Sequence, residues 1–167
     1  QEFEFDMLIF ATGFDAMTGT LLKIDIEGRD GITLAEKWAE GPKTYLGLCI
    51  QGFPNLFTVS GPGSPSVLSN MIVTIEQHIN WIMDCLDAMA ERSANSIEAT
   101  IDAESSWVHS GNEIAAGTLF PTCNSWYLGA NVPGKPRIFM PYVGGFPNYV
   151  EVCQEVADND YPGFSFG

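Results

Sequence analysis

The stretch SGPGSPSVLSNM, Ser60 to Met71, separates two segments whose apolar residues follow different periods. Before it, FPNLFTVSG is a short apolar run after a proline-led turn, which is typical of a buried strand. After it, apolar residues recur at spacings of three and four, which predicts a helix running to about Arg92. The residues of that predicted apolar face are Ile72, Ile75, Ile79, Ile82, Leu86 and Met89. Ser69 or Asn70 is expected to cap the helix, so the stretch predicts a strand–turn–helix junction.

The glycines and serines of this junction match none of the common phosphate-binding or nucleophile loops. A Walker loop requires a lysine, and this turn has none. A dinucleotide fingerprint requires a third glycine, and a nucleophile elbow requires a glycine directly after the serine. A turn that caps a helix is therefore the favoured interpretation. The helix N-terminus would still offer amide groups and a positive dipole end to an anionic or electron-rich group.

The remaining segments are a mixture of strand-like and helix-like patterns, which predicts an α/β fold. Residues 3–12 and the start of 21–31 have strand patterns, the second closed by a turn at Asp30-Gly31. Thr33 and Glu36 form the capping-box pattern of a short helix. A weaker helical pattern covers about 102–119, and a last helix is expected at about 148–158.

Residues 120–147 are rich in proline, glycine, asparagine and aromatic residues. So long a weakly structured stretch within a domain is usually functional or mobile. Its part SWYLGANVPGKPR places Lys135 and Arg137 beside Trp126 and Tyr127. Basic and aromatic side chains on such a loop could grip a phosphate-bearing cofactor. A surface loop whose aromatic residues pack on the core is an equally good interpretation.

Composition excludes some classes of partner. The 7 Lys and Arg against 21 Asp and Glu give a net charge of −14. Because phosphate backbones and anionic membranes attract basic surfaces, neither nucleic acid nor a membrane is expected as a partner. No apolar run is long enough to span a membrane, and no secretory signal is present. The first residues, QEFEFDMLIF, resemble the middle of a longer chain.

The cysteines and histidines give no metal pattern. Cys49, Cys85, Cys123 and Cys153 are 30 to 38 residues apart, and only His78 and His109 supply imidazoles. No metal site is therefore expected. Separated free thiols are typical of a reducing cytoplasm, which is the expected location. His78, one position from the apolar stripe of its helix, is expected to be partly buried and hydrogen-bonded and not catalytic.

Three stretches in the same order resemble flavin-dependent Baeyer–Villiger monooxygenases. DMLIFATGFDAMTG resembles the hinge of these enzymes, with its ATGFD-type sequence. GFPNLFTVSGPGSPSVLSNM followed by IEQHINWI resembles their flavin-facing turn and helix. SWYLGANVPGKPRIFMPYVGG resembles their mobile loop near the C-terminus. The sequence of these stretches is nearest to the phenylacetone and steroid monooxygenase branch, and the resemblance covers essentially the whole chain.

The resemblance implies a two-domain flavoprotein with Rossmann-like FAD and NADPH domains. Residues 1–13 would be the last strand of the NADPH domain and the hinge, at 11–13. Residues 14–167 would be the C-terminal part of the FAD domain, with a mobile loop at 120–147. The implied reaction uses FAD, NADPH and O₂ to insert one oxygen atom into a ketone, giving an ester or lactone.

The resemblance also implies roles for individual residues. Asn70 and Met71 would face the flavin ring, Trp126 would close over NADP, and Lys135 would contribute to the electrostatics of its loop. The ketone pocket would have apolar walls formed by Val67, Leu68 and Met71. No catalytic residue is expected here, because the family's arginine lies upstream.

The family's glycine fingerprints for FAD and NADPH also lie upstream. The 167 residues are therefore expected to be inactive and marginally stable without an N-terminal portion, which becomes the expected partner. Two alternatives remain open. One is a truncated, non-catalytic ligand-binding remnant of the family, and the other is a flavin monooxygenase that oxygenates nitrogen or sulfur.

Overall fold

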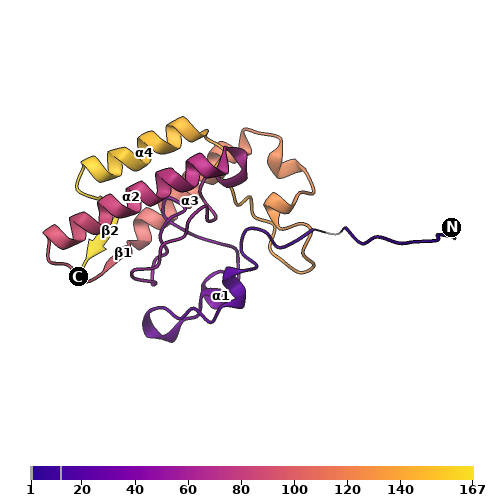
Figure 1. Cartoon of the computed structure of the whole chain (residues 1–167), viewed down its shortest axis with the longest axis horizontal. Coiled ribbons are helices and arrows are strands. Elements are labelled where there is room, and N and C mark those ends of the chain that lie inside the picture. Colours follow the sequence, from indigo (N-terminus) through magenta and orange to yellow (C-terminus); the bar gives the residue numbers. More distant parts are fainter. Residues whose placement is uncertain (1, 12) are drawn as a thin grey trace.

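The structure, a computed structural model, describes residues 2–11 and 13–167. Figure 1 shows the longer helices gathered at one side of the molecule, with a smaller lobe that carries α1 (Leu34–Lys37) below them. Residues 2–11 extend away from this body, and every side chain in that segment is exposed. No helix of the described residues is long and apolar enough to cross a membrane.

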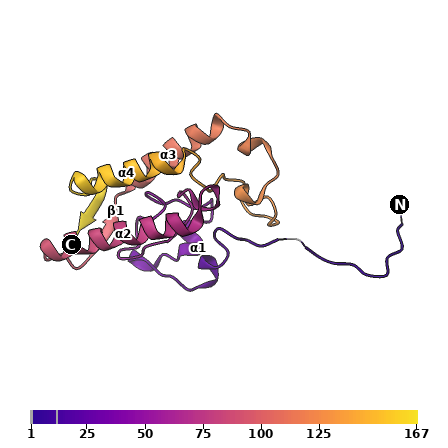
Figure 2. The same cartoon turned by 45° about the horizontal axis from the view of Figure 1, so that its top comes forward.

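Three helices and one small sheet build the main body. The helices are α2 (Met71–Glu91), α3 (Ile101–Ala116) and α4 (Phe146–Asp158). The sheet pairs β1 (Ile97–Ala99) with β2 (Phe164–Phe166) in antiparallel register. Both views show α4 lying alongside α2, with the two strands closing one end of the pair (Figures 1 and 2). The structure thus combines helices with a small sheet, which confirms the expected α/β class with few strands.

The helices begin where their caps predict. The side chain of Asn70 accepts hydrogen bonds from the amides of Ile72 and Val73, which fixes the start of α2. The predicted capping box of α1 is present, because Thr33 and Glu36 each accept from the other's backbone amide. The predicted second and third longer helices are confirmed as α3 and α4.

The main core lies between α2, α4 and the segment 45–49. It contains Trp81, Cys85 and Met89 of α2 and Tyr149, Cys153 and Val156 of α4. Trp81 donates its indole N–H to the carbonyl of Cys153 at 2.8 Å, so the largest side chain of this core is also hydrogen-bonded. A second small core, under α1, is formed by Leu34, Trp38, Ile50 and Phe53.

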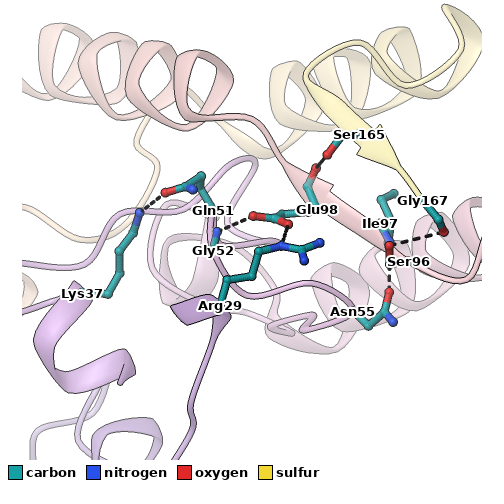
Figure 3. Close-up of polar contacts among 10 residues, drawn as sticks. All are labelled: Arg29, Lys37, Gln51, Gly52, Asn55, Ser96, Ile97, Glu98, Ser165 and Gly167. Carbon is teal, nitrogen blue, oxygen red and sulfur yellow. Dashed lines mark hydrogen bonds and ion pairs between the residues drawn. The ribbon is translucent and has the colours of Figure 1, made fainter. Parts of the chain in front are cut away.

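A seam of polar contacts joins the small lobe to the sheet (Figure 3). The carboxylate of Glu98 on β1 accepts from the amide of Gly52 at 2.8 Å and from Arg29 Nε at 2.6 Å. The side-chain oxygen of Asn55 accepts from the backbone amide of Ile97 at 3.0 Å, and the backbone amide of Asn55 donates to the Ile97 carbonyl at 2.9 Å. Lys37 of α1 binds Gln51 and also pairs with Glu104 of α3. The seam fixes how the lobe sits on the body.

The three strands expected before α2 do not form. Residues 3–11 pair with nothing among the described residues, and position 12 lies outside them. In the other two segments only isolated bridges form, between Glu27 and Thr33 and between Cys49 and Phe57. A strand needs a partner strand to satisfy its amides, and the part of the chain that the structure describes places none beside these segments. The turn at Asp30-Gly31 is confirmed, because both residues have positive φ.

Candidate functional site

The glycine turn of the Ser60–Met71 junction, residues 61–66, is mostly buried and closely packed. A Cβ at Gly63 would lie 2.5 Å from Thr44 Oγ1, and one at Gly61 would lie 2.6 Å from Thr58 Oγ1. Trp107 of α3 donates its indole N–H to the Gly63 carbonyl at 3.0 Å. The glycines are therefore required by close contacts within this chain, which agrees with the interpretation of the stretch as a structural turn. A short 3₁₀ turn at Ser66–Leu68 leads from it to α2.

His78 holds the start of the junction to the core. Its Nδ1 accepts from the Ser60 amide at 3.0 Å, so the proton of the neutral ring is on Nε2, 2.9 Å from the hydroxyl of Tyr149. Tyr149 in turn donates to the carbonyl of Leu46 at 2.7 Å. Burial lowers the pKa of His78 to about 4. The residue is a neutral structural link, and it is more deeply buried than the sequence suggested.

The predicted flavin-facing residues lie together at the start of α2. Asn70 is exposed and uses its side chain as the cap, while Val67 and Leu68 are half-buried just before it. Met71 is 37% exposed, and its backbone amide makes no hydrogen bond to any of the described residues. This corner therefore offers the Met71 amide as a donor, the positive end of a helix of 21 residues and several apolar side chains.

The predicted cofactor residues of the loop lie elsewhere. Trp126 begins the 3₁₀ turn Trp126–Leu128, is half-buried, and contacts the ring of Tyr127 with 4.3 Å between centroids. No hydrogen bond or aromatic contact among the described residues joins Trp126 or Lys135 directly to the Val67–Met71 corner. Two contacts reach the segment 15–18 from these regions. Ser66, directly before the corner, contacts Met17 Sδ at 3.8 Å, and Lys135 binds Asp15 and Thr18.

The loop also pairs with the glycine turn, a contact that the sequence did not suggest. The amide of Gly63 donates to the carbonyl of Met140 at 2.7 Å, and the amide of Tyr142 donates to the Ser64 carbonyl at 2.7 Å. Tyr142 stacks on Trp107 with ring centroids 5.1 Å apart. These backbone pairs connect residues about 80 apart in the sequence, so no local pattern could reveal them.

The three buried thiols are poor candidates for chemistry. Burial raises the pKa of the Cys85 and Cys153 thiols to about 12 and that of Cys49 well above its usual value, which keeps them protonated. No group of three metal-ligating side chains occurs among residues 2–11 and 13–167. A hollow beneath Trp107 and Tyr142 has a volume of about 40 Å³, which suits a water molecule and not a flavin.

Comparison with known proteins identifies the relatives of the chain, although no family model matches it. It is 43% identical over 161 residues to a Baeyer–Villiger monooxygenase of Pseudooceanicola batsensis, covering 96% of the chain and 29% of that protein. It is 43% identical to a methyl acetate-forming acetone monooxygenase of a Gordonia species, with 97% and 31% covered. A phenazine N-monooxygenase of Lysobacter antibioticus is 41% identical, with 98% and 30% covered.

Solved structures give the same result. A steroid monooxygenase bound to NADP has 49% identity and a TM-score of 0.85, over 92% of this chain and 28% of that one. A closed cyclohexanone monooxygenase has 40% identity and a TM-score of 0.91, over 99% of this chain and 31% of that one. The chain thus spans just under a third of these relatives. Over almost all of its length it matches one segment of the Baeyer–Villiger monooxygenases, as expected of a C-terminal portion of such an enzyme.

Proposed function

We propose that this chain is the C-terminal part of an FAD- and NADPH-dependent Baeyer–Villiger monooxygenase that converts a ketone and O₂ to an ester or lactone. The observation that carries the proposal is the match of nearly the whole chain to such enzymes at 43% identity. The whole protein's activity requires an N-terminal portion, which supplies the FAD and NADPH fingerprints and the catalytic arginine that this sequence lacks.

The exposed apolar surface supports a role for that N-terminal portion. Ile72, Ile79 and Met83 of α2 are 73%, 48% and 53% exposed. A helix with this much apolar surface on its open side is typical of an element that is buried in a larger protein. The N-terminal portion of the same enzyme is the proposed occupant.

The domain boundaries follow from the same proposal. Residues 1–13 are the last strand of the NADPH domain and the hinge, and 14–167 belong to the FAD domain. The unpaired, exposed and apolar character of residues 2–11 supports this assignment, because a strand of another domain would find its neighbours there. The hinge includes position 12, which lies outside the described residues.

The corner at the start of α2 fits the flavin ring. Its unpaired Met71 amide and the helix dipole can stabilise negative charge on a reduced flavin, while the Asn70 cap holds that backbone in place. Val67, Leu68 and Met71 would form an apolar wall that orients the ketone and excludes water. The chemistry with O₂ would be carried by FAD after its reduction by NADPH. The residues of this chain would bind the flavin and orient the ketone.

Trp126 is proposed to cover NADPH. It is half-buried, on a turn that can present the indole ring to a nucleotide. A direct contact between Lys135 and the cofactor remains a prediction, and its ammonium already has two partners in this chain. We place the whole protein in the cytoplasm, where NADPH and free thiols are maintained.

The test uses the full-length protein that contains this chain. Its purified form is expected to show flavin absorbance, to oxidise NADPH when a ketone is added and to release an ester or lactone. Met71→Ala should keep the flavin but change KM for the ketone several-fold. Ile101→Ala, a more exposed apolar residue at the start of α3, is the control and should change neither. A protein with neither flavin nor ketone-dependent NADPH oxidation would refute the proposal.

A second candidate, oxygenation of nitrogen, is favoured by the match to the phenazine N-monooxygenase. Both reactions use the same cofactors, so only the product separates them. Mass spectrometry of products from matched ketone and aromatic N-heterocycle substrates would show an ester or an N-oxide. Binding of apolar ligands without any NADPH oxidation would instead indicate a non-catalytic remnant.

A further inference from the structure

The loop that carries Trp126 is fastened to residues 14–18 by a polar cluster. The ammonium of Lys135 donates to Asp15 Oδ1 and, at 2.6 Å, to Thr18 Oγ1. Thr18 Oγ1 also donates to Asp15 Oδ1 at 3.2 Å, so the three side chains form one hydrogen-bonded cluster. Asn131 adds a second attachment, from its side-chain amide to the Phe14 carbonyl at 2.8 Å. The partners lie 117 to 120 residues apart in the sequence.

This cluster is well shielded from solvent for an ion pair. The side chains of Lys135 and Asp15 are only 12% and 26% exposed, and Thr18 is buried. Burial alone would raise the pKa of Asp15, but the hydrogen bond and charge of Lys135 and the bonds of Thr18 outweigh it and lower that pKa. The ammonium is thus committed to a partner within the chain. A shielded pair of this kind couples its two segments more strongly than an exposed one.

The stem of Lys135 crosses the turn on which Trp126 sits. Gly129 ends the Trp126–Leu128 turn with a φ of 69°, and a Cβ there would lie 2.9 Å from Lys135 Cδ. Glycine therefore lets the lysine pass directly over the turn to reach Asp15. Removal of the lysine would free both the turn and the loop end.

Arg137, two residues further on, differs in each of these respects. It is exposed, and it bonds Asn124 within the same loop. It makes no ion pair with any described carboxylate. It carries the same charge as Lys135 but does not attach the loop to another segment, so it is the natural control.

We propose that Lys135 is a positioning residue, which latches the Trp126 loop to the segment 14–18 through Asp15 and Thr18. The latch holds the loop in its folded form before any nucleotide binds. Because the segment 14–18 directly follows the proposed hinge, the position of the loop is tied to that of the hinge. The catalytic consequence rests on the proposed function, whereas the latch itself does not.

The structural test is amide hydrogen exchange on the full-length, nucleotide-free protein. Lys135→Met and Asp15→Asn should each speed exchange across 125–135 about tenfold, which corresponds to about 1.4 kcal/mol. The double variant should be no worse than either single one, because both remove the same contact. Lys135→Arg should restore most of the protection, and Arg137→Met should stay within about twofold of the parent.

The kinetic test separates a latch from a cofactor ligand. In an active enzyme Lys135→Met should raise KM for NADPH several-fold with a smaller change in kcat, and Asp15→Asn should do the same without touching the lysine. If Lys135→Met raises KM while exchange of the loop stays unchanged, Lys135 is a direct cofactor ligand and the latch is refuted. Unchanged exchange in both single variants also refutes it. An inactive full-length protein would overturn the proposed function but leave the exchange result valid.

Discussion

Two faces of α2 differ in how deeply they are buried in this structure. One face, formed by Thr74, His78, Trp81, Cys85 and Met89, is buried against this chain. The adjoining face, which includes Ile72, Ile79, Met83 and Leu86, is open to solvent. The open face is the more hydrophobic of the two, yet none of the described residues covers it. The comparison teaches that burial within a chain follows specific partners, whereas the hydrophobic stripe indicates only that some partner exists.

The largest effect is expected from the covered face, with Trp81→Ala. Trp81 is 4% exposed, contacts the ring of Tyr161 and donates to the Cys153 carbonyl, so truncation leaves a cavity and removes a buried hydrogen bond. The full-length protein should lose about 3–5 kcal/mol of unfolding free energy, measured by chemical denaturation. A loss of under about 1 kcal/mol would show that this face is not the core.

The next effect is a dependence on pH that comes from His78. The folded pKa of about 4 lies below the ordinary histidine pKa of 6.5, so the unfolded chain binds the proton first as pH falls. The stabilisation is complete above pH 6.5 and is lost progressively toward pH 4, by up to about 3 kcal/mol.

His78→Gln isolates this contribution, because the carboxylates that also titrate in this range are common to both proteins. The difference in unfolding free energy between parent and variant should shrink as pH falls from 7 to 4. If it stays constant over that range, His78 is not buried in the neutral form.

The sequence predicts what depends on neighbours along the chain and misses what depends on distant partners. The Asn70 cap, the Thr33–Glu36 box and all three longer helices were predictable, because their signals lie within a few residues. Two of the three predicted strands reduce to single bridges, and the segment 3–11 stays unpaired, since no partner strand lies beside any of them. The strands that do form, β1 and β2, were missed because each has only three residues.

The predicted apolar face of α2 illustrates the same limit. Of its members, Met89 is buried, whereas Ile72, Ile79 and Leu86 are exposed. The face that is actually covered includes Thr74 and His78, which are polar. Their burial depends on Ser69 and Tyr149, which bond them at 2.6 and 2.9 Å. At the candidate site, the corner at Val67–Met71 was predictable as a unit, but the partners of Lys135 were not.

The third prediction addresses the open face directly. Ile79→Ala should destabilise the full-length protein by about 2 kcal/mol if the N-terminal portion covers that side chain. Asn80→Ala, its exposed neighbour, should change stability by less than about 0.5 kcal/mol. Equal effects of the two substitutions would mean that the open face stays open in the whole protein.

Methionine oxidation tests the same face without a mutation. Met83 is 53% exposed and Met89 only 8%. Under mild peroxide, the separate 167-residue chain should oxidise Met83 much faster than Met89, and protection of Met89 reports that the chain is folded. In the full-length protein both methionines should be protected, as peptide mass spectrometry can show. Rapid oxidation of Met83 there would contradict the proposed interface.

The smallest effect on stability is expected for Asn70. As the N-cap it fixes where α2 begins, and so it affects both faces of the helix. Asn70→Ala removes the acceptor for the amides of Ile72 and Val73 and should cost about 1 kcal/mol in the full-length protein. Asn70→Ser keeps a capping oxygen and should cost almost nothing. If flavin content follows stability across this pair, Asn70 acts only by holding the backbone of Met71 in place. If Asn70→Ser keeps stability but loses flavin, the amide side chain itself contacts the cofactor, and the division of α2 into a structural cap and a binding backbone is wrong.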